Sequence, residues 1–187
     1  MHHDVTLSRD GIVLRPLTPA DAPALRTVVD EETWGGMSVP FPRTDAEMAA
    51  HLQTLVGADG LLAFAVEQDG ELVGRTTFYD YVPGLRVEIG NTIYARTVWG
   101  TTLNPTAKLL LLTHAFEEMQ VGRVALRCDS RNRRSHDAIR RLGATYEGTL
   151  RRFRPSADGS IADVDYFSVL AEEWPDVRAG LEARLTG

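Results

Sequence analysis

Residues 98–105 read Val98-Trp99-Gly100-Thr101-Thr102-Leu103-Asn104-Pro105, and this stretch indicates the fold. Residues 87–94 before it are rich in β-branched and aromatic side chains and predict a strand. Residues 106–119 after it predict an apolar helix with Pro105 at its first position. A strand, a short Gly/Thr loop and a helix N-terminus present unpaired backbone N–H groups and the positive end of a helix dipole, which together suit a phosphate. A capped loop that binds nothing would show the same features.

A second informative stretch follows the predicted helix, at residues 123–144. It begins Arg123-Val124-Ala125-Leu126-Arg127-Cys128-Asp129-Ser130-Arg131-Asn132-Arg133-Arg134-Ser135 and ends Ala138-Ile139-Arg140-Arg141-Leu142-Gly143-Ala144. This pattern predicts a strand and then a helix, with Gly143 just past the helix end, where glycine is favoured. Asn132 and Ser135 lie one helical turn apart, so both can face the same side near the helix start. Asn132 could also serve only as the helix N-cap.

The order of these elements resembles the GNAT superfamily of acyl-CoA-dependent N-acyltransferases. Within it, the chain most resembles the RimJ/RimL-type branch of ribosomal-protein N-terminal acetyltransferases. The likeness runs from Gly11 to about Trp174 and includes Glu88-Ile89-Gly90 and Glu173-Trp174-Pro175. The resemblance implies a single-domain α+β fold with a mixed, mostly antiparallel central sheet, a splayed parallel strand pair and flanking helices. It also implies acetyl-CoA as cosubstrate.

The other local signals agree with an α+β arrangement rather than a repeating βαβ fold. Thr18 predicts the N-cap of a first helix, and Thr44 with Glu47 forms a capping-box pattern for a second. Gln68-Asp69-Gly70 predicts a hairpin turn. We expect one domain over residues 1–187, with a core of about 11–174. The remaining expected elements are strands at 11–16, 61–67, 71–81, 86–94, 144–153 and 161–170, and helices at 18–29, 44–56 and 175–185.

Size and composition fit a globular domain with a full core. The chain has 187 residues, 43% of them hydrophobic and 25% charged. No apolar run approaches the ~20 residues that cross a bilayer, so we expect no membrane association. Met1-His2-His3-Asp4 lacks the features of a signal peptide, and a cytoplasmic location is therefore expected. Cys128 is the single cysteine, which excludes an intrachain disulfide.

The net charge of −6 is unevenly distributed. Residues 123–154 hold ten arginines against three acidic residues, a net +7, which leaves −13 on the rest of the chain. A basic region inside an acidic protein argues against a general nucleic-acid surface. It fits a small polyanionic ligand beside the basic part and a cationic substrate approaching the acidic part. A solvated arginine-rich face without specific purpose is the other interpretation.

The resemblance implies a set of cofactor contacts. The pantetheine arm is expected to pair with the exposed backbone of Ile93 to Arg96, and the pyrophosphate to bind the loop at the start of the next helix. The chain departs from the usual loop pattern at Trp99, Thr102 and Asn104, and Asn104 is expected to cap the helix. Arg131 and Arg133 could add phosphate contacts. The predicted cofactor-binding residues are Ile93, Tyr94, Trp99, Gly100, Thr101, Thr102, Leu103, Asn104, Asn132 and Arg134.

Transfer to an amine needs a neutral nucleophile, a polarised thioester carbonyl and a proton for the departing thiolate. Glu88 is the candidate base, although a strand salt bridge would explain it equally well. Ser135 is the nearest candidate donor, because Ile139 stands where many relatives have a tyrosine acid. Residues 30–43 form either a binding lid, with Trp34 and Met37 as substrate-binding residues, or a connection that only covers the core.

The expected function is transfer of an acetyl group from acetyl-CoA to a primary amine by direct attack. A protein N-terminus or an amine-bearing small molecule is the expected acceptor, and a homodimer is possible. The alternative is a degenerate GNAT-like protein that binds acyl-CoA or a partner without turnover. The five histidines and Cys128 show no zinc-ligand spacing, so no metal is expected. We expect His114 to be packed and His136 to face the surface.

Overall fold

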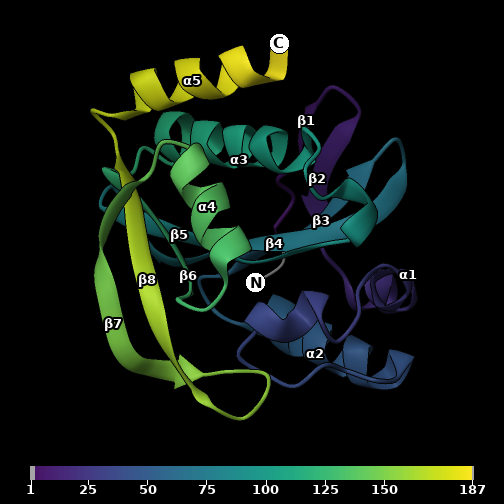
Figure 1. Cartoon of the computed structure of the whole chain (residues 1–187). Coiled ribbons are helices and arrows are strands. Elements are labelled where there is room, and N and C mark those ends of the chain that lie inside the picture. Colours follow the sequence, from purple (N-terminus) through teal and green to yellow (C-terminus); the bar gives the residue numbers. More distant parts are fainter. Residues whose placement is uncertain (1–2, 187) are drawn as a thin grey trace.

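The computed structural model describes residues 3–186 (Figure 1); Met1, His2 and Gly187, which the sequence analysis included in its single domain, lie outside this range. One eight-stranded sheet has the order β1-β2-β3-β4-β5-β6-β8-β7. All neighbouring strands are antiparallel except β5 and β6, so the expected mixed α+β fold is confirmed. The strands are β1 (Leu7–Arg9), β2 (Ile12–Pro16), β3 (Leu62–Gln68), β4 (Glu71–Val82), β5 (Arg86–Tyr94), β6 (Arg123–Asp129), β7 (Thr145–Pro155) and β8 (Ile161–Leu170).

Helices cover both faces of the sheet. In Figure 1, α3, α4 and α5 lie on one face, and α1 and α2 lie on the other. Within residues 3–186, no helix combines the length and the apolar character needed to cross a membrane. The α-helices are α1 (Ala22–Val28), α2 (Asp45–Gly57), α3 (Leu103–Thr113), α4 (Arg133–Arg141) and α5 (Trp174–Thr186), with short helical turns at Pro19–Asp21, Thr33–Gly36, Arg96–Val98 and His114–Glu118.

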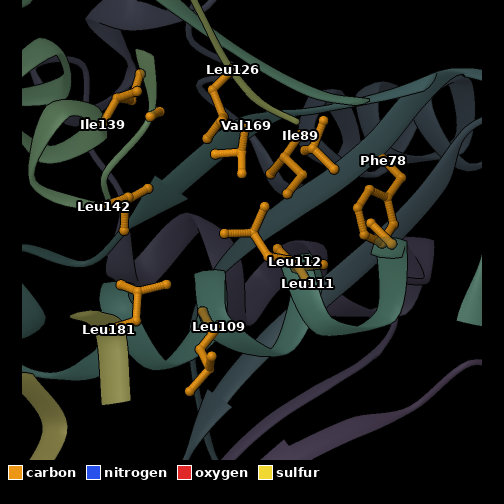
Figure 2. Packing of buried hydrophobic residues seen from close by; sticks show 14 of the residues in the cluster. Phe78, Ile89, Leu109, Leu111, Leu112, Leu126, Ile139, Leu142, Val169 and Leu181 are labelled. Atoms are coloured by element: carbon orange, nitrogen blue, oxygen red, sulfur yellow. The ribbon is translucent and has the colours of Figure 1, made fainter. Parts of the chain in front are cut away.

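The main core lies between the sheet and α3. Leu109, Leu111 and Leu112 of α3 pack with sheet residues such as Phe78 and Ile89 (Figure 2). Helices α4 and α5 add side chains to the same cluster. Because α3 is buried on most of its surface, it is held rigidly, and its N-terminus has a defined position beside the end of β5. A second cluster packs α1 and α2 on the opposite face.

The hairpin between β3 and β4 turns at Asp69 and Gly70, both with positive φ. This is the backbone of a type I′ turn, which the Asp-Gly pair predicted. The capping box of Thr44 and Glu47 is also present. The first predicted helix is instead divided into a short turn and α1, because Pro23 has no N–H to donate to the carbonyl of Pro19. Strand β1 was not predicted.

The start of α3 differs from the prediction. The helix begins at Leu103, two residues before Pro105, and the Thr101 hydroxyl accepts a hydrogen bond from the Leu103 N–H. Proline is tolerated anywhere in the first helical turn, because those N–H groups have no partner within the helix. Asn104 is therefore a residue of the first turn and not the cap. The helix also ends earlier than predicted, in a wider turn over His114–Glu118.

Candidate active site

The parallel strands β5 and β6 separate part of the way along their length. They are paired only where Arg86–Ile89 of β5 faces Arg123–Leu126 of β6. Beyond Ile89 the two strands diverge, and a cavity of about 520 Å³ opens between them. Its walls come from β5, β6, α3 and α4, and from the loop of Trp99 and Gly100. The sequence predicted this divergence only through the family resemblance.

A bulge in β5 shapes the wall of the cavity. Gly90 pairs with Thr77 and Ile93 with Arg75, so β5 has one extra residue. Asn91 takes up the irregularity with a φ of 49°, a conformation that asparagine tolerates better than most residues. The buried guanidinium of Arg75 donates to the Asn91 carbonyl at 2.8 Å and so holds the bulge in place.

Most of the predicted cofactor residues line this one cavity. Trp99 connects two of its walls: its indole N–H donates to the Tyr94 carbonyl at 3.0 Å, and the Arg134 guanidinium lies 3.3 Å from the centre of its ring. This contact desolvates Arg134 and lowers its pKa from the usual value. The predicted residues that line the cavity are Ile93, Tyr94, Trp99, Gly100, Thr101, Asn104, Asn132, Arg134, Ser135 and Met37.

Two predicted cofactor residues lie outside the cavity lining. Leu103 is only 1% exposed and belongs to the main core. Thr102 is exposed at the N-terminus of α3 and is absent from the lining. Arg131 is also engaged elsewhere: its guanidinium pairs with Asp129 at 2.7 Å and donates to the Ser156 hydroxyl. Within this basic stretch, Arg134 is thus better placed than Arg131 to meet an anion in the cavity.

Asn132 has both of the roles that the sequence left open. Its side-chain oxygen accepts a hydrogen bond from the Ser135 N–H at 3.0 Å, so it is the N-cap of α4. It also lines the cavity, and its amide nitrogen lies against Gly36 of the 30–43 segment. Capping therefore fixes the direction of the Asn132 amide and leaves its nitrogen at the cavity wall.

Glu88 is buried and does not line the cavity. Its carboxylate accepts a hydrogen bond from the Tyr79 hydroxyl and pairs with the Arg127 guanidinium at 2.8 Å. Burial raises the pKa of Glu88, and the contacts with Tyr79 and Arg127 oppose that rise. Tyr79 and Arg127 do line the cavity. Direct contact between Glu88 and a substrate is thus excluded in this geometry, and any influence of Glu88 passes through Tyr79 or Arg127.

The 30–43 segment covers one end of the cavity. Arg154 of β7 donates to the carbonyls of Gly36 and Met37 and so ties the segment to the opposite side of the opening. Met37 lines the cavity, as expected. Trp34 does not: it is fully buried, and its indole N–H donates to the Val39 carbonyl. Trp34 is a core residue beneath the segment, so its predicted contact with substrate is wrong in this structure.

The charge of the lining was not predicted. Its described residues include six basic side chains and one carboxylate, Asp129, which is paired with Arg131. The basic side chains are Lys108, Arg127, Arg134, Arg141, Arg154 and Arg184. Arg184 of α5 and Lys108 of α3 come from outside the basic stretch of the sequence. The sequence did single out Lys108, because it is the one lysine of the chain, against nineteen arginines.

Cys128, His136 and Asp165 gather beside the cavity, with their possible ligand atoms within 4.8 Å of one another. His136 is partly buried and bonded to Asp165 at 2.9 Å, so its predicted surface position is wrong. His114 packs against Phe78, as expected. Burial raises the pKa of the Cys128 thiol to about 12. This thiol therefore stays protonated at neutral pH and is a poor nucleophile.

Comparison with known proteins agrees with this geometry. The model of the acetyltransferase (GNAT) domain family matches residues 12–145. A Bacillus subtilis (strain 168) protein named "Putative ribosomal N-acetyltransferase YdaF" is 28% identical over 176 residues, covering 88% of this chain and 94% of that protein.

Two solved structures are similar over almost the whole chain. A "putative acetyltransferase" from T. thermophilus is 37% identical, with a TM-score of 0.92 and coverage of 99% of both chains. Mycobacterium smegmatis RimJ, solved in complex with CoA-disulfide, is 25% identical, with a TM-score of 0.83 and coverage of 98% of this chain and 97% of that one.

Proposed function

We propose a function from one premise: this chain belongs to the GNAT acetyltransferase family, in its RimJ/RimL-type branch. The proposed reaction is transfer of an acetyl group from acetyl-CoA to a primary amine, by direct attack of the amine on the thioester. The proposed acceptor class is a protein N-terminus, and the proposed location is the cytoplasm.

The observation that carries the proposal is the sign of charge in the cavity. Six basic side chains and one paired carboxylate line an opening between diverging parallel strands. Coenzyme A carries its negative charge on its phosphates, and such a lining attracts it. Gly100 and Thr101 at the start of α3, with Arg134 beside them, would hold the pyrophosphate. Asn132 and the free edge of β5 would hold the pantetheine arm.

The opposite end of the cavity would receive the amine. It is lined by Tyr79, Arg127, Arg154 and Met37. The Tyr79 hydroxyl donates a hydrogen bond to Glu88, so Tyr79 can pass its proton to Glu88 as its phenol oxygen takes one from the incoming amine. Glu88 then acts as the proton sink behind Tyr79, and Arg127 stabilises the carboxylate. A covalent acetyl-cysteine is disfavoured because the Cys128 thiol stays protonated.

The acceptor class is supported by the relatives. YdaF is named "Putative ribosomal N-acetyltransferase", which supports an amine on a protein as acceptor. RimJ was solved in complex with CoA-disulfide, which supports coenzyme A as carrier of the acetyl group. Because a fold does not fix a substrate, the acceptor has to be tested directly.

The test combines binding and turnover. Calorimetry measures acetyl-CoA affinity, and release of free thiol measures transfer to peptides with free N-termini, with the same peptides acetylated at the N-terminus as controls. We expect binding, and thiol release only with the free N-termini. Thiol release with small amines but not with the peptides would mean that the acceptor is a small amine and not a protein N-terminus. Binding without thiol release would instead favour the alternative of an acyl-CoA-binding protein without turnover.

A matched pair of variants tests the site itself. Asn132→Ala should weaken acetyl-CoA binding, whereas Arg133→Ala should not, because Arg133 belongs to the same helix but does not line the cavity. A directed hydrogen bond contributes about 0.5–1.5 kcal/mol, while an exposed charge often contributes less. Equal affinities for both folded variants would refute the assignment of Asn132.

A further inference from the structure

Lys108 is an unusual basic residue in this chain. It is the only lysine, in a sequence with nineteen arginines, and it is only 5% exposed. It lies on α3, five residues from the helix start, or about 7.5 Å along the helix axis. Its side chain lines the cavity between β5 and β6. The single lysine ammonium group of the chain is therefore held inside the proposed acetyl-CoA site.

The surroundings of Lys108 give its ammonium no counter-ion. Its Nζ donates to the Thr92 hydroxyl at 3.0 Å, and Thr92 exchanges a 2.8 Å hydrogen bond with Thr76. Within residues 3–186, no carboxylate pairs with Lys108. An ammonium has three N–H groups, so the Thr92 bond leaves N–H groups that can face the cavity.

Burial brings the titration of the Lys108 amine close to neutral pH, because desolvation lowers its pKa from 10.5 to about 7. A guanidinium in the same place would keep its proton at every physiological pH. The other charged or titratable groups lining the cavity are Tyr79 on β4, Tyr94 on β5, Arg127, Cys128 and Asp129 on β6, Arg134 and Arg141 on α4, Arg154 on β7 and Arg184 on α5. Desolvation is the cause of the lowered pKa, and Asp129 is already paired with Arg131.

With the cofactor placed as proposed above, Lys108 lies beside the path of the pantetheine arm. The pyrophosphate is proposed at Gly100 and Thr101, and the pantetheine arm along β5 towards its bulge. Thr92, the partner of Lys108, belongs to that bulge. On the other wall, Ile139 has no proton to give. Helix α4 thus offers no acidic side chain at position 139, and the N–H groups of Lys108 can take the role of proton donor.

We propose that Lys108 is the proton donor to the departing coenzyme A thiolate. This inference rests on the proposed function. The amine nitrogen forms a bond to the acetyl carbon and the carbon–sulfur bond breaks. The sulfur takes a proton from Lys108 Nζ. The proton that the new amide nitrogen loses passes through Tyr79 to Glu88, and exchange with water then returns a proton to Nζ and removes one from Glu88. The products are an N-acetylated amine and coenzyme A with a free thiol, and no charge is gained or lost.

The first test needs no acceptor and uses free coenzyme A. Thiolate absorbance is titrated against pH for coenzyme A bound to the wild type, Lys108→Met and Lys108→Arg. A nearby cation lowers the pKa of an acidic group by about 1–3 units. We therefore expect bound coenzyme A to form thiolate at a lower pH in the wild type and Lys108→Arg than in Lys108→Met. Identical titrations in all three proteins would overturn the proposal.

The second test uses the wild type alone and is independent of variant folding. With isotope-labelled lysine, Lys108 is the only lysine that can give a side-chain amine signal in NMR. Its titration midpoint should lie near neutral pH and should rise when coenzyme A binds, because a thiolate stabilises the ammonium. A midpoint unchanged by bound coenzyme A contradicts a contact with the sulfur. Acetylation of Lys108 by acetyl-CoA contradicts the role of proton donor, because Nζ would then be an acceptor of the acetyl group.

Turnover separates this proposal from the proposed function. With a peptide acceptor, Lys108→Met should lower kcat by about 10²–10⁴-fold and change acetyl-CoA affinity little. Lys108→Arg should also lower kcat, because its guanidinium keeps its proton and can stabilise the thiolate only by charge. Unchanged kcat in Lys108→Met overturns the role of Lys108 and leaves the proposed function intact. Absence of coenzyme A binding in the wild type overturns both.

Discussion

Replacing Lys108 by methionine should stabilise the protein at neutral pH, by an amount that depends on pH. The lysine has a pKa of about 7 in the folded protein and an ordinary value of 10.5. The difference corresponds to about 4–5 kcal/mol of unfavourable free energy when the pH is below 7. The lost hydrogen bond to Thr92 costs about 1 kcal/mol in the opposite direction. We expect a net gain of about 3–4 kcal/mol at or below pH 7.

The sign of the pH dependence follows from proton binding. Between pH 7 and about 10.5 the unfolded chain holds the Lys108 proton and the folded protein does not, so raising the pH stabilises the wild type. Lys108→Met has no such group. Its advantage should therefore shrink as the pH rises and disappear near pH 10, where only the lost hydrogen bond is left.

The assay is urea unfolding followed by circular dichroism, at several pH values from 6.5 to about 10. Thr92→Val is the matched control, because it removes the same hydrogen bond and leaves the lysine. Its loss of stability should be about 1 kcal/mol and should not follow the same pH trend. A constant difference between wild type and Lys108→Met across this range would refute the reasoning, because it would show that Lys108 does not titrate near neutral pH.

Three further predictions concern the walls of the site. Gly74→Ala should lower the free energy of unfolding by about 1–3 kcal/mol, because the new Cβ would lie 2.2 Å from the Ile93 carbonyl oxygen. Gly57→Ala is the control in the same denaturation assay. Its new Cβ meets nothing within 4 Å, so the free energy of unfolding should not fall. Glu88→Gln should lower kcat with little change in acetyl-CoA affinity, and superimposable pH profiles of kcat/KM would return Glu88 to a purely structural role. Asn132→Ala should lower the free energy of unfolding by about 1 kcal/mol, because the helix loses its N-cap. Asn132→Asp keeps the cap and should keep thermal stability, but its added negative charge should weaken acetyl-CoA binding in calorimetry. Equal affinity of Asn132→Asp and wild type would contradict an anion site.

Local signals in the sequence determined the elements of this protein. Asp69-Gly70 specified its hairpin turn, because both residues adopt positive φ easily. Thr44 and Glu47 specified the start of α2 through their reciprocal hydrogen bonds. The prediction of β5 matched the structure at both ends, since its apolar and β-branched residues lie between clear turn residues. These features depend on neighbours within four or five residues, and a sequence displays such neighbours directly.

The divergence of β5 and β6 was predictable only by resemblance. The sequence of β5 does not show that its pairing with β6 stops at Ile89. The end of the pairing depends on how α3 and α4 separate the two strands. The helix start at Leu103 was also missed, since a proline fits several positions of a first turn equally well. Boundaries of this kind depend on packing and shift by a residue or two.

The roles of individual side chains were decided by contacts between distant parts of the chain. The Glu88 carboxylate pairs with Arg127 of the neighbouring strand and does not line the cavity. Trp34 is buried in the second core cluster by packing against α2. Lys108 lies in an apolar helix, and only the fold places its amine beside Thr92 in a cavity lined by arginines. Burial and charge depend on everything that surrounds a group in space, so the sequence named the candidates and the tertiary structure determined which of them reach the cavity.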